Sequence, residues 1–387
     1  MPGPELGPEH DQVRLLHIAR MRLVHCADVH LDAAFVGLGL PAARRRRAAI
    51  RQAFHKVVQT ALDIGADALT VGGDLYEDLR SQRETTAFLQ EELERASCPI
   101  LVVPGNHDYW HPGSLYARER WPANVHIFNS SEFSEVEVAG WRIFGAAHLK
   151  PKGTGNLLGS FRVPKGGPAI ALFHGSEQGQ LAFQGEGKED HAPFSEAEIS
   201  RCGFRFALVG HFHTPRVTDW LTYPGNPEPL TFGEQGTRGA AVVVMDDDRP
   251  DHPPQVEIVP VATFSVADLD VDISECSHSE AILDRIEQAL PQDELVACRV
   301  RLTGELGEGV RLSPTELLGR LRKDDRSIDL VVACRPHLDL DFLRQAPDAR
   351  GQFVRALMAR PDFDSEVVQS ALLAGLNALL GEEPALL

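Results

Sequence analysis

Histidine, aspartate and asparagine side chains follow apolar runs of this sequence at five separate places. The clearest case is Pro104-Gly105-Asn106-His107-Asp108, directly after the apolar run 100–103. The other four places are Asp28-Val29-His30, Gly72-Gly73-Asp74, His174-Gly175 and Gly210-His211-Phe212-His213. Each apolar run predicts a buried strand, and ligands bind at the carboxyl edge of open α/β sheets. We therefore expect these groups to converge at one edge of a sheet.

The side-chain types at these places predict metal chemistry. Imidazole and carboxylate ligands without thiolate suit Mn, Fe or Zn, and fit neither a cysteine-type structural zinc site nor a calcium loop. So many ligands exceed the needs of one ion but suit two ions if one carboxylate bridges them. Paired ions can activate a water and stabilise both the attacking and the leaving oxygen of a phosphoryl displacement. Without metal, the gathered carboxylates would repel one another.

Alternating strands and helices must position these groups. Apolar runs at 68–71 and 100–103 predict strands, and helical spacing is expected over about 42–64 and 81–96. Further strands are expected within 125–145 and at 169–173, 206–209 and 239–245. This pattern predicts a layered α/β domain over residues 21–262. Residues 1–20 carry three prolines and no strand pattern, so we expect a mobile N-terminal tail there.

A second pattern begins near residue 262. Strand, helix, strand, helix and strand follow one another, which predicts a βαβαβ accessory domain over 263–345. Ser277-His278-Ser279-Glu280 and Ser313-Pro314-Thr315-Glu316 are typical of capping boxes that start its two helices. C-terminal helices are expected over 346–387, with an apolar stripe at Val368, Leu372, Leu376 and Leu379. The stripe is expected to pack on its own domain, and docking to a partner's helices is the alternative.

Composition limits the class of protein. The chain has 387 residues, 43% of them hydrophobic, with no transmembrane-length apolar run and no signal-peptide pattern. Its six scattered cysteines favour buried, reduced thiols in a cytoplasmic protein. The net charge of −18 argues against a general polyanion binder. Nucleic acid is not excluded, because a local basic surface, metal ions or a partner subunit could supply the attraction.

One basic loop stands out against this acidity. Residues 150–165 contain Lys150, Lys152, Arg162 and Lys165, and no Asp or Glu. The loop could be a solvated surface segment, or it could contact phosphates. Other histidines lack the strand-end placement of the candidate ligands, and we expect His25, His111, His126, His148 and His191 to lie on the surface or to be satisfied in the core.

The five motifs, present in order over roughly 21–245, resemble those of the calcineurin-like metallophosphoesterases. Within that superfamily the chain is most similar to the bacterial DNA repair exonucleases of the SbcD and YhaO type. The segments that carry this likeness are His30-Leu31-Asp32, Gly73-Asp74-Leu75-Tyr76, and 223–239 with Tyr223-Pro-Gly-Asn-Pro227. The resemblance implies a two-sheet αββα sandwich with a smaller C-terminal α+β (βαβαβ) capping domain.

The resemblance also implies roles for single residues. Asp28, His30, Asp74 and His213 would hold one metal ion, and Asp74, Asn106, His174 and His211 the second, with Asp74 bridging. Manganese is implied in both places, whereas the ligand types alone also allow iron or zinc. His107 would not be a ligand but would stabilise charge on the phosphate and help to protonate the leaving oxygen. Asp108 would orient His107.

Three functions follow from this sequence. The first is a metal-dependent DNA nuclease, an exonuclease or an endonuclease in DNA repair, working with an SMC-like ATPase of the SbcC or YhaN type; a homodimer is a further expected partner state, because the family often works as a dimer. Its loop 150–165 would contact DNA phosphates. The second is a small-substrate phosphodiesterase or phosphatase on the same metal centre, which suits the acidic charge. The third is a non-catalytic subunit that binds a partner through the C-terminal stripe, but such a subunit would not need the metal ligands.

Overall fold

The computed structural model describes residues 20–179, 190–246, 249, 252–307, 310, 312–322 and 326–380. The predicted tail over 1–20 therefore lies outside the described residues, apart from Arg20, which begins the first strand. The chain divides into two compact units, with the boundary between Val266 and Ala267. The predicted boundaries at 262 and 345 stay predictions, and the two units are described one at a time.

The first sheet of unit 1 holds the strands that precede the first three motifs. Its order is β12-β11-β1-β2-β3-β4, and β1 to β4 are parallel while β11 runs antiparallel to β1 and to β12. The strands are β1 (Arg20–Cys26), β2 (Ala68–Val71), β3 (Ile100–Val102), β4 (Val125–Ile127), β11 (Gly239–Asp246) and β12 (Gln255–Pro260). β2 is buried at every position, as expected for a strand covered on both faces.

The second sheet holds the strands before the other two motifs. Its order is β5-β6-β7-β8-β10-β9, with β6, β7, β8 and β10 parallel. The strands are β5 (Ser134–Val138), β6 (Trp141–Gly145), β7 (Ala169–His174), β8 (Phe206–Gly210), β9 (Arg216–Val217) and β10 (Leu221–Tyr223). The short β9, β10 and β12 were not predicted from the sequence.

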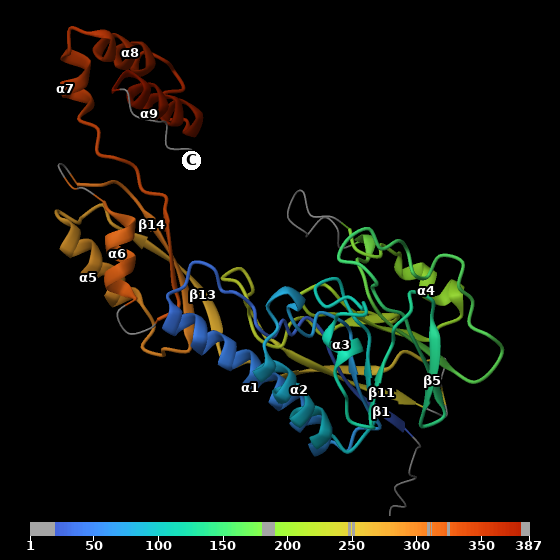
Figure 1. Cartoon of the computed structure of the whole chain (residues 1–387). Helices are drawn as coiled ribbons and strands as arrows, with labels where there is room; N and C mark the ends of the chain where they lie inside the picture. Colours follow the sequence, from blue (N-terminus) through green and yellow to red (C-terminus); the bar gives the residue numbers. More distant parts are fainter. Residues whose placement is uncertain are drawn as a thin grey trace, which may run out of the picture. The chain divides into compact units, whose positions relative to one another are not determined.

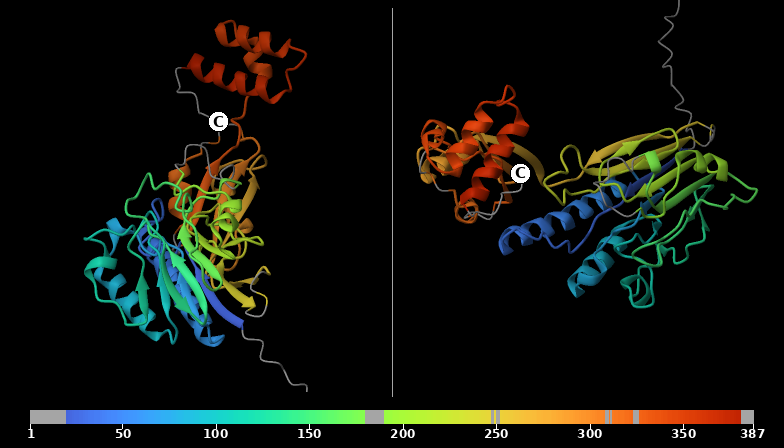
Figure 2. Two further views of the ribbon diagram at one scale, coloured as in Figure 1. Left: turned by 90° about the vertical axis from the view of Figure 1, so that its right-hand side faces the viewer. Right: turned by 90° about the horizontal axis from the view of Figure 1, so that it is seen from above.

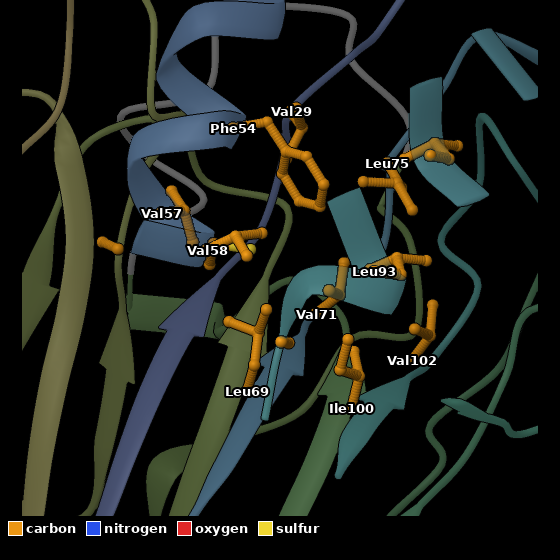
Figure 3. Packing of buried hydrophobic residues seen from close by; sticks show 14 of the residues in the cluster. Val29, Phe54, Val57, Val58, Leu69, Val71, Leu75, Leu93, Ile100 and Val102 are labelled. Atoms are coloured by element: carbon orange, nitrogen blue, oxygen red, sulfur yellow. The ribbon is translucent and has the colours of Figure 1, made fainter. Parts of the chain in front are cut away.

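Two helices cover the outer face of the first sheet. α1 (Leu40–Asp63) and α2 (Arg83–Arg95) lie side by side (Figures 1 and 2), and the short η1 (Asp78–Arg80) precedes α2. Figure 3 shows Phe54, Val57 and Val58 of α1 packed toward the sheet residues Leu69 and Val71. The predicted helical spacing was therefore correct, because the apolar positions of α1 form one face that the sheet buries.

The remaining layers complete the sandwich. A second core lies between the sheets, where Leu23 and Leu101 of the first sheet pack in one cluster with Leu172 and Leu208 of the second. A third core covers the outer face of the second sheet and includes Ile199 of α4 (Glu196–Cys202). Helix, sheet, sheet and helix follow one another, which confirms the predicted two-sheet sandwich. The short helix α3 (Leu115–Arg118) follows the Asn-His-Asp turn.

Unit 2 contains a small sheet and a group of helices. The sheet order is β13-β14-β15, with β14 and β15 parallel. The elements are β13 (Ser265–Asp272), α5 (Ser279–Ala289), β14 (Val296–Thr303), α6 (Pro314–Leu321), β15 (Ile328–Val332), α7 (Leu340–Gln345), α8 (Ala349–Met358) and α9 (Glu366–Leu380). In α9, Leu372 and Leu376 pack with Val354 of α8, whereas Leu379 is exposed.

The helix starts of unit 2 only partly match the prediction. Ser313 caps α6 and accepts a hydrogen bond from the amide of Glu316, which is one of the two contacts of the expected capping box. The expected box at Ser277 and Glu280 is wrong, because His278 is the capping residue of α5 and its ring accepts from the amide of Ala281. All six cysteines are unpaired and five are buried. Among the described helices, none combines the length and the apolar composition that crossing a membrane requires.

Candidate metal centre

The five motifs meet where the carboxyl ends of strands from both sheets adjoin, and not at the edge of a single sheet as predicted. The amide of Asp28, after β1, donates to the carbonyl of Gly73, after β2, at 3.0 Å. The amide of His211, after β8 of the second sheet, donates to the Asp28 carboxylate at 3.0 and 3.1 Å. A Cβ at Gly105 would collide with the Asp74 carboxylate, so only glycine allows the turn after β3 to approach Asp74 this closely.

Several candidate ligands occupy left-handed backbone conformations. The φ angles of Asp28, His30 and Asp74 are 54°, 51° and 52°. Such angles are uncommon for residues other than glycine and cost free energy that the surrounding structure must offset. Hydrogen bonds offset it here, because the amide of His30 donates to the carbonyl of Asp74 at 2.9 Å and that of Leu31 to Leu75 at 3.0 Å. The strained backbone conformations therefore occur where these side chains converge.

One half of the site gathers Asp28, His30 and His213. Their nearest side-chain N and O atoms all lie within 4.8 Å of one another. His30 Nε2 also lies 3.7 Å from Asp74 Oδ2. This nitrogen is buried and has no hydrogen-bond partner. A buried, unsatisfied imidazole nitrogen aimed at carboxylates is what a metal ligand requires.

The other half is built around His174. Its Nε2 lies 3.0 Å from Asn106 Oδ1, 3.4 Å from Asp74 Oδ2 and 3.3 Å from His211 Nδ1. Its other nitrogen, Nδ1, donates to the carbonyl of Gly72 at 2.9 Å, which leaves Nε2 to face the other groups. Asp74 contacts both His30 and His174, so it occupies the position of a bridging carboxylate. The structure thus brings all seven predicted ligands together.

Two glutamates that the sequence analysis missed fix the rings of the first half. His30 Nδ1 donates to Glu77 at 2.8 Å, and His213 Nδ1 donates to Glu234 at 2.8 Å. A carboxylate on the outer nitrogen sets the tautomer and orientation of a metal-binding histidine. Glu77 could have been suspected from its place three residues after Asp74, and Glu234 from its place in the segment 223–239 that carries the family likeness.

The electrostatics of the site are those of paired charges. Burial alone would raise the pKa of the Asp74 carboxyl, but the His174 and His30 rings hold it well below its usual range. Burial would lower the pKa of His174, yet the Asp74 carboxylate outweighs burial and raises it to about 9. Mixed imidazole, carboxylate and amide donors, with His30 Nε2 unsatisfied, fit divalent ions with N and O ligands. Two ions sharing Asp74 would use every donor.

The two predicted catalytic residues lie in different surroundings. The His107 ring packs edge-on to His30 with centroids 4.7 Å apart, and its Nδ1 donates to Glu77 at 3.2 Å. This hydrogen bond raises the pKa of His107 to about 9. The fully buried Asp108 instead accepts from the amides of Gly105 and Leu75 at 2.6 and 2.7 Å. Glu77, and not Asp108 as expected, therefore holds the His107 ring, while Asp108 holds the backbone of the turn.

The other histidines mostly follow the prediction. His25 is buried and contacts Thr70 Oγ1 at 2.9 Å, and His111 pairs with Asp78 at 3.1 Å. His148 is buried and only partly satisfied: Nε2 donates to the carbonyl of His174 at 2.8 Å, whereas the buried Nδ1 has no hydrogen-bond partner among the described residues. His126 is exposed. His191 differs from the prediction, because it lines the pocket over the candidate ligands.

A pocket of about 830 Å³ opens over the two halves of the site. Its walls include the candidate ligands His30, Asp74 and His211, together with Phe212 and Arg216. Of the basic loop, Lys152 reaches this pocket, whereas Lys150, Arg162 and Lys165 are exposed outside its walls. The predicted role of all four residues in DNA binding stays a prediction.

The family model of the calcineurin-like phosphoesterases matches residues 21–215, which include all seven candidate ligands. The chain belongs to this family. Its members are metallophosphoesterases, so the ligand set described above is the expected place of a pair of divalent ions.

Curated relatives show modest identity. The chain is 28% identical to the uncharacterized metallophosphoesterase YhaO of Bacillus subtilis over 240 residues, which are 58% of this chain and 57% of that protein. It is 28% identical over 245 residues to the DNA double-strand break repair protein Mre11 of Methanopyrus kandleri, covering 57% and 52%. With the Mre11 protein of Haloferax volcanii it shares 26% over 302 residues, covering 76% and 63%. The chain thus spans between half and two thirds of the length of these relatives.

Proposed function

We propose that this metallophosphoesterase is a DNA nuclease that hydrolyses phosphodiester bonds in DNA repair. The observation that carries the proposal is the convergence of seven N and O donors, with Asp74 in both halves, beneath a pocket that holds His107. The relatives named for DNA double-strand break repair supply the substrate class.

The roles of the chain's own residues follow from their positions. Two divalent ions held by this set, which we propose to be manganese, would activate a water and stabilise charge on the phosphate oxygens. Glu77 fixes His107 through Nδ1, so the ring can present Nε2 to a phosphate in the pocket. From there His107 would stabilise charge on the phosphate and donate a proton to the leaving oxygen. Asp108 keeps the turn that carries His107 in place through its hydrogen bonds to the backbone.

The wider setting is also part of the proposal. The basic loop with Lys150, Lys152, Arg162 and Lys165 would contact DNA backbone phosphates, which position DNA without reading its sequence. Unit 2 would serve as a capping domain. An SMC-like ATPase of the SbcC or YhaN type is the proposed partner, and a homodimer is the proposed assembly; similarity to proteins named for DNA double-strand break repair supports both.

A cleavage assay tests the proposal. End-labelled duplex and single-stranded DNA are incubated in Mn²⁺ with the wild type, His107→Ala and Asp74→Ala. We expect the wild type to cut DNA, His107→Ala to lose about 100-fold or more in rate as for a lost general acid–base group, and Asp74→Ala to lose its activity together with its metal ions. Bound Mn²⁺ is expected to stay in His107→Ala and to fall in Asp74→Ala. DNA left intact by the wild type, both alone and with the ATPase, would contradict the nuclease.

A small-substrate phosphodiesterase or phosphatase is the second candidate, because a net charge of −18 opposes a long polyanion more than a small one. Hydrolysis of bis-p-nitrophenyl phosphate, together with intact DNA in the same assay, would favour this function.

A further inference from the structure

The helix α1 (Figure 1) differs in charge from the rest of this acidic chain. Over its 24 residues it carries six lysines and arginines but a single acidic residue, Asp63, at its last position. Four of the basic residues follow one another as Arg44-Arg45-Arg46-Arg47. The whole chain has instead 56 acidic and 38 basic residues. The helix therefore forms a local excess of positive charge within unit 1.

The stability of α1 does not account for these arginines. Arg44, Arg47 and Arg51 lie along one face of the helix, because residues three and four positions apart are neighbours. Like charges at this spacing destabilise a helix, whereas alternating charges along a face would stabilise an exposed one. The first turn of α1 has no acidic residue either, although one would be stabilising there. The row of charges is therefore a cost to the helix itself.

Two of the three arginines leave their charge to the surface. Arg51 is paired, because its Nη2 lies 3.4 Å from Asp32 Oδ1 and donates to Thr85 Oγ1 at 2.9 Å. Among the described residues, none forms an ion pair or a hydrogen bond with the side chain of Arg44 or Arg47. Arg44 is exposed and Arg47 is partly exposed. We call Arg44 and Arg47 the arginine face of α1.

The arginine face lies beside the segment that forms one wall of the pocket over the candidate ligands. Arg46, between the two arginines in the sequence, is buried and donates from Nη2 to the carbonyl of Pro229. The next two residues, Leu230 and Thr231, line the pocket. The amide of Leu230 donates to Glu234, another residue of this wall, at 2.6 Å. A strand that leaves the pocket over this wall would therefore meet the first turns of α1.

We propose that the arginine face of α1 binds backbone phosphates of the DNA strand that extends from the pocket. A guanidinium stays charged and forms paired hydrogen bonds with phosphate oxygens. Such contacts hold DNA without reading its sequence. This inference rests on the proposed function and deepens it, because it names a surface that holds DNA outside the metal centre. The attraction is local and short-range, so it acts in spite of the net charge of −18.

Fluorescence anisotropy of labelled duplex DNA, measured against salt concentration, tests this surface. The full chain carries His107→Ala and is loaded with Mn²⁺, so that DNA is bound but not cut. Each phosphate contact steepens the fall of log affinity with log salt by about 0.9, because it releases counterions from DNA. Arg44→Gln and Arg47→Gln should therefore each weaken binding and reduce the slope by about 0.9. Arg44→Lys and Arg47→Lys keep the charge and should keep the slope.

Arg120→Gln is the matched control, because it removes one exposed charge on the far side of α2. The carbonyl of Arg120 accepts from Gln90 of α2 at 2.7 Å. Glu92 of α2 instead contacts His55 of α1 at 2.9 Å, and residues two apart project about 200° apart around a helix. The helix α2 thus separates Arg120 from α1. The control should leave both the affinity and the slope unchanged.

The surface is overturned if neither glutamine variant reduces the slope, or if Arg120→Gln reduces it equally. It is also overturned if the parent protein binds vesicles of phosphatidylglycerol and not DNA. A variant whose unfolding temperature or Mn²⁺ content falls is replaced by Arg44→Met or Arg47→Met and measured again.

The DNA cleavage assay separates this proposal from the nuclease. Binding that depends on the arginine face, in a protein that leaves DNA intact, would retain the surface and refute the nuclease. DNA cleavage by a protein whose arginine variants bind DNA as the parent does would refute the surface and retain the nuclease.

Discussion

At the residue scale, Glu77 contacts both a candidate metal ligand and the proposed catalytic histidine. It accepts from His30, a candidate ligand, and from His107, the proposed catalytic ring. Burial would raise the pKa of Glu77, but these hydrogen bonds lower it to about 2, so the group is charged at neutral pH. Glu234 makes the same contact to His213, and no hydrogen bond joins it to His107 in the described structure. The two glutamates therefore form a matched pair.

We expect Glu77→Gln and Glu234→Gln each to weaken Mn²⁺ binding by about 10- to 100-fold, as for other carboxylates behind metal-binding histidines. At saturating Mn²⁺, Glu77→Gln should still lower kcat on bis-p-nitrophenyl phosphate by about tenfold or more, because His107 loses its charged partner. Glu234→Gln should recover near the wild-type kcat. Calorimetry and steady-state kinetics measure the two effects. Equal recovery of both variants would mean that Glu77 acts only on the metal ligand.

A second residue-scale effect concerns pH and stability. Burial lowers the pKa of His25 to about 4, below the value of about 6.5 expected in the unfolded chain. The folded state therefore binds fewer protons, and the stability that neutral His25 contributes is present above pH 6.5 and is lost as pH falls toward 4. From pH 7 to 4.5 this loss amounts to about 2 kcal/mol. His25→Gln cannot be protonated, so its deficit relative to wild type should shrink by that amount.

Denaturant unfolding of the chelator-treated protein at both pH values measures this change. His252→Gln, at an exposed position, is the control and should leave the pH dependence unchanged. A deficit of His25→Gln that stays constant between pH 7 and 4.5 would refute the assignment.

At the element scale, the sequence predicted those parts of the site that follow strong strands. β2, β3, β7 and β8 are nearly continuous apolar runs, β1 is buried over its last four residues, and candidate ligands lie at or shortly after the end of each strand. These local signals sufficed to find all seven residues that the structure brings together as candidate ligands. The prediction of a long helix before β2 succeeded for the same reason, since α1 repeats its apolar positions over 24 residues.

The missed features depend on contacts between distant segments. His191 carries no local signal, and backbone hydrogen bonds to distant segments hold it at the pocket: its amide bonds to Ser176 Oγ, and the amide of its neighbour Ala192 bonds to Thr154. The carboxylate that holds His107 lies 30 residues away, at Glu77, although the adjacent Asp108 was the simpler expectation. The α5 cap was misassigned by one residue because serine, histidine and serine follow one another there. In the structure the amide of Ala281 donates to the imidazole of His278. A local sequence pattern does not determine to which of several nearby acceptors a backbone amide will donate its hydrogen bond.

At the scale of the whole molecule, the acidic charge and the proposed substrate oppose each other. A net charge of −18 repels a polyanion at long range, so binding must come from short-range contacts. Divalent ions at the candidate ligands would supply such contacts in the pocket of unit 1. Recognition of DNA would thus be concentrated at the catalytic site and the arginine face beside it, and unit 2 or a partner would add the remaining contacts.

Because the candidate ligands and the pocket all lie in unit 1, we expect this unit to fold and to bind metal without unit 2. Its three hydrophobic clusters contain residues no later than Val261, and Phe264 packs beneath Arg46 with 4.7 Å from the guanidinium carbon to the ring centroid. A fragment of residues 20–266 keeps all of these groups and each candidate ligand. We expect it to unfold in one cooperative transition and to bind Mn²⁺ with an affinity within about threefold of that of the full chain, because a domain with its own core folds independently.

Thermal unfolding and Mn²⁺ calorimetry measure both properties, with Asp74→Ala in the same fragment as the control. A fragment that unfolds without cooperativity, or that folds and binds no Mn²⁺, would show that unit 2 is needed to form the metal centre.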